Sequence, residues 1–345
     1  MSKIDYKTAG VDIDAGNEAV ARIKDDVKST FTPNVLTGLG SFGSLFDLSD
    51  IARNYKNPVM VQSIDGVGTK AIIARKMQKF DTIGIDLLSA CANDILVMGA
   101  KPLTFLDYIA NDHLDPAIIA EMVKGMTKAC RETGVALVGG ETAEMPDTYL
   151  KNEHDLVGIV TGVVEKDRII TGEKIAIGNI VLGLPSSGLH TNGYSLARKV
   201  FFDIAGLDVS DTVDGLPVTV GEALLEPHIN YTNHVMALMD SGLPIHGIAH
   251  ITGGGLVENI PRILPSGLSV IIKEDSFPKL PVFNVMQQLG DIEIGEMYRA
   301  FNMGIGLVII VSEDSVKPIK HILEKFSPVY EIGQVVSGNN IVEIH

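Results

Sequence analysis

The stretch Ser63-Ile64-Asp65-Gly66-Val67-Gly68-Thr69-Lys70 begins two residues after 59–61, a short apolar run directly after Pro58. Such a run predicts a strand, and this strand would deliver Asp65 to its carboxyl end. The two glycines let the backbone bend tightly, so that several N–H groups can point at one anion. Lys70 adds a positive charge, and a carboxylate beside bound phosphate implies a cation between them. The stretch therefore predicts a loop that binds a metal–nucleotide complex.

The sequence after this loop predicts a helix that carries oxygen-bearing side chains. Apolar residues recur at helical spacing and predict one buried face: Ile83, Leu87, Cys91, Ile95 and Met98. Asp86 and Asn93 are seven residues apart and share another face, with Asp94 beside them. Such groups are costly to bury without a partner. Beside the glycine loop the set favours a metal site, although a solvated helix face is the alternative for any one of them.

Composition narrows the class of protein. The chain has 345 residues, 46% of them hydrophobic, which is enough for about two domains with substantial cores. A net charge of −15 argues against nucleic acid or an anionic membrane surface as a partner. The two cysteines lack metal-ligand spacing, and their scarcity fits a reducing compartment. Without an apolar signal region or a run of membrane-spanning length, we expect a soluble cytoplasmic protein.

Three further features of the first half could contact a ligand. Lys24 lies off the apolar face of an expected helix, where it could reach a phosphate or simply be solvated. The run Gly38-Leu39-Gly40-Ser41-Phe42-Gly43 has the letters of a dinucleotide fingerprint, but no strand precedes it, so it is either a loop over a nucleotide or a turn. Glu141 follows a buried strand at 135–138 and is a candidate for metal or ribose contact. For Glu144 an acid near a helix N-terminus is an equal alternative. No P-loop motif occurs in the chain.

The second half places polar loops after two expected strands. One loop follows the strand 179–184 and gathers hydroxyls, an amide and an imidazole: Ser187, His190, Thr191 and Asn192. It enters a helix and so predicts an anion site, with His190 as acid or base or as a structural residue. The other loop is Thr252-Gly253-Gly254-Gly255, after the strand 247–251. Each half reads as a sheet with helices packed on it, with domains at 1–168 and 169–345.

Seven ordered blocks resemble the phosphoribosylformylglycinamidine cyclo-ligase family over essentially the whole chain. They are Asp12-Ile-Asp-Ala-Gly16, the run from Gly38 to Gly43, Asp65 to Lys70, Asp81-Thr-Ile-Gly-Ile-Asp86, Gly139-Gly-Glu-Thr-Ala-Glu-Met145, Ser186 to Ser195 and His250-Ile-Thr-Gly-Gly-Gly255. The resemblance implies two α+β domains, of which the first binds ATP and dimerises and the second completes the substrate and ATP sites. It also implies a homodimer whose first-domain sheets pair into a barrel.

The activity that the resemblance implies is ATP-dependent cyclisation of formylglycinamidine ribonucleotide. Asp65 and Asp94 would then hold Mg²⁺, with Asp86, Asn93 and Glu141 as helpers. The nucleotide would contact Lys24, Gly38, Gly40, Phe42, Gly43 and the residues Gly66, Val67, Gly68, Thr69 and Lys70. The substrate would contact Ser187, Thr191, Asn192 and the loop of Thr252, Gly253, Gly254 and Gly255, with His190 binding substrate or assisting proton movement.

Three other classes compete with this interpretation. The wider superfamily includes selenophosphate synthetase and thiamine-phosphate kinase, but the first usually needs a reactive cysteine in a glycine-rich N-terminal segment, which this sequence lacks. A non-catalytic nucleotide-binding protein would not require Asp65, Lys70 and Asp94 together. A nicotinamide-dependent oxidoreductase is the weakest alternative, because the fingerprint at Gly38 lacks its strand.

Overall fold

The computed structural model describes residues 10–345 and divides the chain into two compact units. The first unit contains the described residues up to Ala92 together with Pro102–Glu165, and the second contains Asn93–Lys101 and Lys166–His345. The sequence placed the segment 93–101 with the first half of the chain. The structure instead groups it with the second unit, and Asn93 and Asp94 go with it.

Within the described chain, the first unit holds a four-stranded mixed sheet in the order β1-β4-β2-β3. Its strands are β1 (Pro58–Gly66), β4 (His154–Glu165), β2 (Lys101–Asn111) and β3 (Ala136–Glu144). β1 pairs antiparallel with β4 along its whole length, whereas β2 and β3 are parallel. The parallel pair is joined by α5 (Pro116–Thr133), since such a pair requires a crossover connection.

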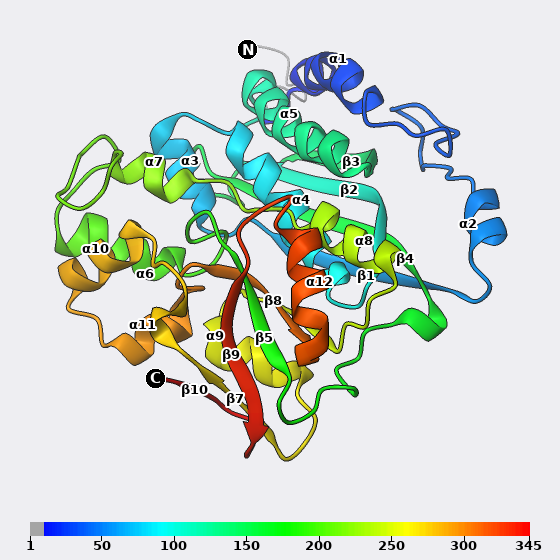
Figure 1. Cartoon of the computed structure of the whole chain (residues 1–345). Coiled ribbons are helices and arrows are strands. Elements are labelled where there is room, and N and C mark those ends of the chain that lie inside the picture. The colour runs from blue at the N-terminus through cyan, green and yellow to red at the C-terminus, as the bar shows by residue number, and fades with distance from the viewer. Residues whose placement is uncertain (1–9) are drawn as a thin grey trace, which may run out of the picture. The chain divides into compact units, whose positions relative to one another are not determined.

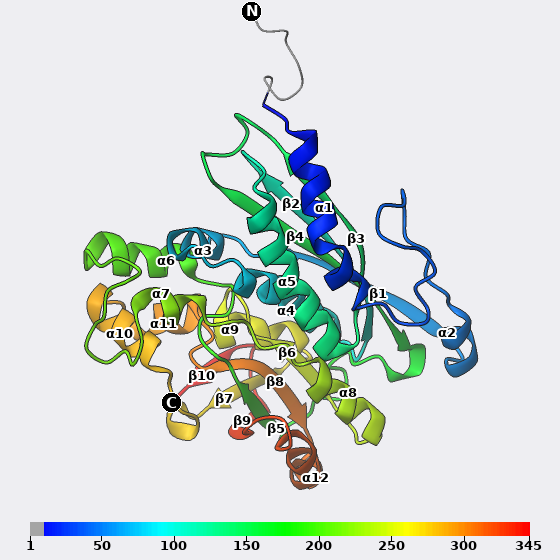
Figure 2. The same cartoon turned by 90° about the horizontal axis from the view of Figure 1, so that it is seen from above.

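The helices of the first unit begin and end at residues typical of those positions. α1 (Ile13–Lys28) is capped by Asp12, whose side chain accepts hydrogen bonds from the first turn. Asp115 caps α5, which ends at Gly134 in the left-handed conformation. α1 and α5 lie side by side and both contact β3 (Figure 2). The other helices are α2 (Ser49–Asn54), α3 (Lys70–Met77) and α4 (Asp81–Leu96), whose last four residues belong to the second unit.

The first-unit sheet also leaves large apolar side chains exposed. Met60 and Ile64 on β1 alternate onto one face, and both are 66% exposed. Ile159 is the register partner of Ile64 and points to the same face, where it is also exposed. An uncovered apolar sheet face of this kind is typical of an interaction surface.

The second unit is built on a six-stranded mixed sheet in the order β10-β7-β9-β5-β8-β6 (Figure 1). The strands are β5 (Ile180–Pro185), β6 (Gly247–His250), β7 (Leu268–Ile272), β8 (Ile305–Val311), β9 (Tyr330–Ser337) and β10 (Val342–Ile344). Every residue of β8 is buried, as expected for a central strand covered on both faces. α8 (Thr232–Ser241) and α12 (Glu313–Leu323) contribute Leu238 and Ile319 to one core with β8.

Short helices connect these strands. They are η1 (Lys166–Arg168), α6 (Tyr194–Arg198), the π-helical turn η2 (Lys199–Ile204), α7 (Val220–Leu225), α9 (Gly255–Asn259), η3 (Ile260–Ile263), η4 (Glu274–Ser276), α10 (Pro281–Gly290) and α11 (Ile294–Ala300). Two mixed sheets packed with helices confirm the α+β class predicted from the sequence.

The helix expected over 81–98 is the element in which structure and sequence differ most. α4 ends at Leu96, and Met98 lies in the turn after it. The prediction of a single buried face is wrong, because Asp86 and Asn93 are fully buried as well. No helix within residues 10–345 is both long enough and apolar enough to cross a membrane.

Candidate functional site

The glycine loop at the end of β1 carries Asp65 near the end of the strand, as the sequence predicted, but the N–H of Val67 already donates to the carbonyl of Leu156 at 3.2 Å. Asp65 stands one residue before the end of the strand, and its Oδ1 accepts a hydrogen bond from the N–H of Gly66 at 2.7 Å. Gly68 has a φ of +61°, a conformation that few other residues adopt readily. α3 begins directly after Thr69, at Lys70. The loop therefore presents a half-buried carboxylate beside the first turn of a helix.

Lys70 itself is placed differently from the prediction. Its Nζ lies 2.8 Å from Oδ2 of Asp86, and both side chains are completely buried. A buried ion pair needs close geometry, because each charge has lost its hydration. Lys70 was predicted to contact the nucleotide and Asp86 to bind the metal. In the structure they pair with each other and so join α3 to α4.

Two other features predicted in the first unit, Lys24 and the run from Gly38 to Gly43, are exposed, whereas Val67 of the glycine loop is only 1% exposed. Lys24 lies on the solvent side of α1. The run from Gly38 to Gly43 is an exposed turn in a loop closed by a β-bridge between Val35 and Phe46, and Phe42 is fully exposed. These groups could contact a ligand only from the surface of the unit.

Glu141 is exposed on β3 and lines a cavity of about 420 Å³ with α1 and further carboxylates. One of them is Asp107, and burial raises its pKa to about 7. Glu144 accepts hydrogen bonds from the N–H groups of Asp12 and Leu114 at 2.6 and 2.9 Å. Glu144 thereby ties β3 to the start of α1, in line with the dipole alternative.

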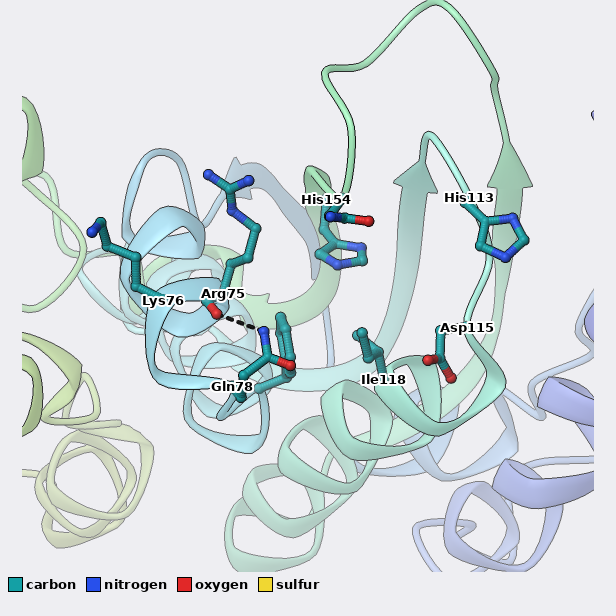
Figure 3. A pocket seen from close by; sticks show the side chains of 9 residues that line it. Arg75, Lys76, Gln78, His113, Asp115, Ile118 and His154 are labelled. Atoms are coloured by element: carbon teal, nitrogen blue, oxygen red, sulfur yellow. Dashed lines mark hydrogen bonds between the residues drawn. The ribbon is translucent and has the colours of Figure 1, made fainter.

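A second cavity of the first unit has a volume of about 470 Å³ (Figure 3). Arg75 and Lys76 reach its rim from the end of α3, and His113 and Asp115 line its opposite side. Between them His154 is held at 2.5 Å by the side chain of Asn111, and burial lowers its pKa. None of the site residues predicted from the sequence lines this cavity.

In the second unit Asn93 serves as a structural connector. Its side-chain oxygen accepts a hydrogen bond from the N–H of Tyr231, and its amide nitrogen donates to the carbonyl of Ile229, both at 2.9 Å. The same nitrogen lies 3.2 Å from Nε2 of His228. Because both ends of this buried amide bind protein groups, the structure gives Asn93 a role in holding the segment 229–231.

Asp94 leads into a cluster of histidines. Its Oδ1 accepts a hydrogen bond from Nδ1 of His250 at 2.9 Å, and its side chain is 37% exposed. Nε2 of His250 lies 3.1 Å from Nε2 of His228, which in turn stacks on His190 with ring centres 3.9 Å apart and planes inclined by 20°. All three imidazoles are buried, so the partly exposed carboxylate stands at the outer end of a buried chain of rings.

His190 is the innermost ring of this cluster. Its φ is +62°, which is rare for a residue with a side chain and is a feature of many functional sites. Its Nε2 accepts a hydrogen bond from the N–H of Ser187 at 3.3 Å. Across from it, a Cβ added to Gly306 would lie 2.5 Å from Cε1 of His190 and still closer to the hydroxyl of Tyr231. Gly306 therefore makes room for the ring.

The two polar loops predicted in the second half of the chain meet at this cluster. The hydroxyl of Thr191 is 3.4 Å from Nδ1 of His228. A Cβ added to Gly253 would lie 3.3 Å from the side-chain oxygen of Asn192, which places the two loops side by side. Asn259 donates to the carbonyls of Gly253 and Gly255 at 3.2 and 2.8 Å and so fixes the second loop.

The half-buried side chains of Thr191 and Asn192, the exposed Gly253 and the carboxylate of Asp94 suit a polar ligand. Sequence reasoning selected His190 but missed His228 and His250 as members of the site. His250 could have been found from its position, because it ends a buried strand directly before a glycine-rich loop. His228 lies in the irregular segment after α7 and has no such signal.

Comparison with known proteins covers both units. Residues 50–164 match the family described as AIR synthase related protein, N-terminal domain, and residues 176–345 match its C-terminal domain. The chain is 49% identical over 337 residues to the phosphoribosylformylglycinamidine cyclo-ligase of Geobacillus thermodenitrificans, covering 97% of this chain and 96% of that protein. It is 52% identical over 314 residues to the protein of the same name from Trichlorobacter lovleyi, covering 91% and 89% of the two chains.

Two solved structures share the fold at low sequence identity. Thiamine-monophosphate kinase from Stenotrophomonas maltophilia superposes with a TM-score of 0.69 at 16% identity, covering 94% of this chain and 95% of that chain. The hydrogenase maturation protein HypE in complex with ATP gives 0.66 at 20% identity, covering 94% and 90%. At these identities the likeness concerns the fold alone.

Proposed function

The chain belongs to the phosphoribosylformylglycinamidine cyclo-ligase family, and on that basis we propose that it closes the imidazole ring in purine biosynthesis. The substrates are formylglycinamidine ribonucleotide and ATP, and the products are 5-aminoimidazole ribonucleotide, ADP and phosphate. The observation that carries this proposal is the relationship to the named cyclo-ligases along nearly the whole chain.

The chemistry asks the protein mainly for positioning and for stabilisation of charge. Phosphoryl transfer from ATP to the formyl oxygen makes that oxygen a leaving group. The amidine nitrogen then attacks the same carbon, and phosphate departs as the ring closes. Neither step needs a covalent bond to the protein, which agrees with a site built from loop amides, hydroxyls and carboxylates.

We infer that Mg²⁺ accompanies the nucleotide. Mg²⁺ is usually bound by one or two carboxylates, water and substrate phosphates instead of by a protein cage. Within residues 10–345 no three His, Cys, Asp or Glu side chains form a metal-binding group. Asp65, Asp94 and Glu141 are partly exposed carboxylates and fit this role, whereas Asp86 and Asn93 are buried against protein groups. The ion would neutralise phosphate charge during transfer.

The proposed division of labour follows the two parts of the chain, 1–168 and 169–345. In the first, Lys24, the loop from Gly38 to Gly43 and the loop from Gly66 to Thr69 would contact ATP. In the second, the substrate would be bound by Ser187, Thr191, Asn192 and the loop from Thr252 to Gly255. Because His190 is completely buried, it would act on the substrate through its neighbours and not by direct contact. We also propose a cytoplasmic location, in keeping with a biosynthetic role of this kind.

We also propose that two copies associate through the first-unit sheet. The support is the apolar face formed by Met60, Ile64 and Ile159, which is exposed in a single chain. Closing two such sheets into a barrel would bury these side chains and the edges of the sheets. Sedimentation analysis should show a dimer for the parent protein and a monomer for Ile64→Glu. A parent protein that sediments as a monomer at micromolar concentration would refute this association.

The activity is tested by incubating the purified protein with formylglycinamidine ribonucleotide, ATP and Mg²⁺. ADP release and the new imidazole proton signals are followed together by NMR. Equal amounts of ADP and imidazole are the expected result. ADP without imidazole would indicate a related kinase or synthetase instead, and neither product would indicate a nucleotide-binding protein without this activity.

A further inference from the structure

Asp94, one of the proposed metal ligands, has a buried imidazole as its partner. Nδ1 of His250 donates to its Oδ1 at 2.9 Å, since a carboxylate can only accept. The His250 side chain is only 3% exposed, whereas that of Asp94 is 37% exposed. One carboxylate oxygen is thus held from inside the protein, which restrains the orientation of a group whose side chain partly faces solvent.

The ring of His250 is in turn held from two sides. It ends β6, a strand that is buried throughout and paired with β8. On its inner side Nε2 lies 3.1 Å from Nε2 of His228, with the ring planes inclined by 41°. His228 is itself fixed by the amide of Asn93 and by stacking on His190. The three rings leave His250 little freedom to turn about its side-chain bonds.

We propose that His250 is a positioning residue that orients the carboxylate of Asp94 for the cation of the nucleotide complex. This inference rests on the proposed function, because it assumes that Asp94 binds that cation. A metal ligand whose orientation is fixed by a second hydrogen bond binds its ion more tightly, and loss of such an outer contact typically weakens binding about 10–100-fold. His228 and His190 support the same orientation by packing behind His250.

The test compares two substitutions, each of which places an amide nitrogen at the position of a different ring nitrogen of His250. In His250→Asn the amide nitrogen takes the place of Nδ1 and can still donate to Asp94. In His250→Gln the amide reaches the place of Nε2 and leaves Asp94 without that donor. Binding of Mn²⁺ to each protein is measured in the presence of a non-hydrolysable ATP analogue, with the analogue alone as the blank. The readout is the electron paramagnetic resonance signal of the free ion, beside the apparent KM for Mg²⁺ and kcat. We expect His250→Gln to raise the Kd for Mn²⁺ about 10-fold or more and His250→Asn to change it less than about 3-fold.

Two further variants separate the possible failures. His234→Gln removes a buried histidine of the same unit that hydrogen-bonds to Ser327, and it should leave the Kd unchanged. Asp94→Asn should weaken Mn²⁺ binding at least as much as His250→Gln. If Asp94→Asn binds Mn²⁺ like the parent, the metal assignment within the proposed function fails. If Asp94→Asn loses Mn²⁺ while His250→Gln keeps it, the positioning role is refuted and the proposed function stands.

Discussion

Replacing Lys70 by methionine tests the buried ion pair between α3 and α4. Methionine has nearly the same length, so the change removes the charge and leaves the carboxylate of Asp86 in the protein interior. The pair distance is 2.8 Å and neither side chain is exposed to solvent. Breaking such a pair from one side costs about 3–5 kcal/mol of folding free energy, because the remaining charge is buried without its counter-charge.

The double variant Lys70→Met with Asp86→Leu measures the interaction free energy between the two charges. Replacing both charges by apolar groups of similar size is often neutral or stabilising. We therefore expect the double variant to be at least about 2 kcal/mol more stable than Lys70→Met alone. Lys128→Met on the exposed side of α5 is the matched control and should stay within about 0.5 kcal/mol of the parent.

The chain contains no tryptophan, so urea unfolding is best followed by far-ultraviolet circular dichroism. Two units can unfold in separate transitions, and the variant should shift the one that belongs to the first unit. An unchanged unfolding midpoint combined with a large loss of ATP affinity would refute this reasoning. That outcome would restore Lys70 to the nucleotide contact predicted from its sequence.

Three further predictions concern other parts of the molecule. Asp65→Asn should lower turnover roughly 10²-fold in the coupled ADP and imidazole assay while the melting temperature stays within a few degrees, and normal turnover with reduced stability would make Asp65 structural. Gly306→Ala should destabilise the second unit by about 1–3 kcal/mol in thermal melting, since its Cβ would overlap Tyr231 and His190; Gly295→Ala has open space and should be nearly neutral. Burial lowers the pKa of His234 to about 4, below its value near 6.5 in the unfolded chain. The stability that the buried neutral ring contributes is therefore present at neutral pH and is lost as the pH falls from 6.5 towards 4. The parent should lose about 1–2 kcal/mol more than His234→Gln between pH 7.5 and pH 5, and equal losses would contradict the assignment.

Much of the fold follows from local patterns that a sequence displays. Strands read from short apolar runs, such as 179–184, appear within one residue of the expected bounds, here in β5. β1 ends at Gly66, directly after Asp65, and the positive φ of Gly68 turns the chain towards α3. Such features depend on neighbours in the chain, which is why they can be read without the tertiary structure.

The partners of charged and polar side chains could not be read in this way. Lys70 and Asp86 lie on successive helices, and only the angle between those helices brings them together. The cluster around Asp94 draws His190, His228 and His250 from three separate segments, and nothing in the sequence around any one of them indicates the other two. Asn93 was predicted as an oxygen ligand because its side chain carries an oxygen. The sequence does not show that the N–H of Tyr231 donates to that oxygen.

The tight approach of His190 and Gly306 means that these two positions cannot vary independently over generations. A side chain at position 306 is blocked while the imidazole and the hydroxyl of Tyr231 are present. Position 190 has a left-handed backbone, so asparagine or glycine can replace histidine there with the least backbone strain. Any mutational path that enlarges position 306 must therefore first shrink its neighbours, a case of sign epistasis. A library that randomises either position alone would miss the combinations that the fold could accept.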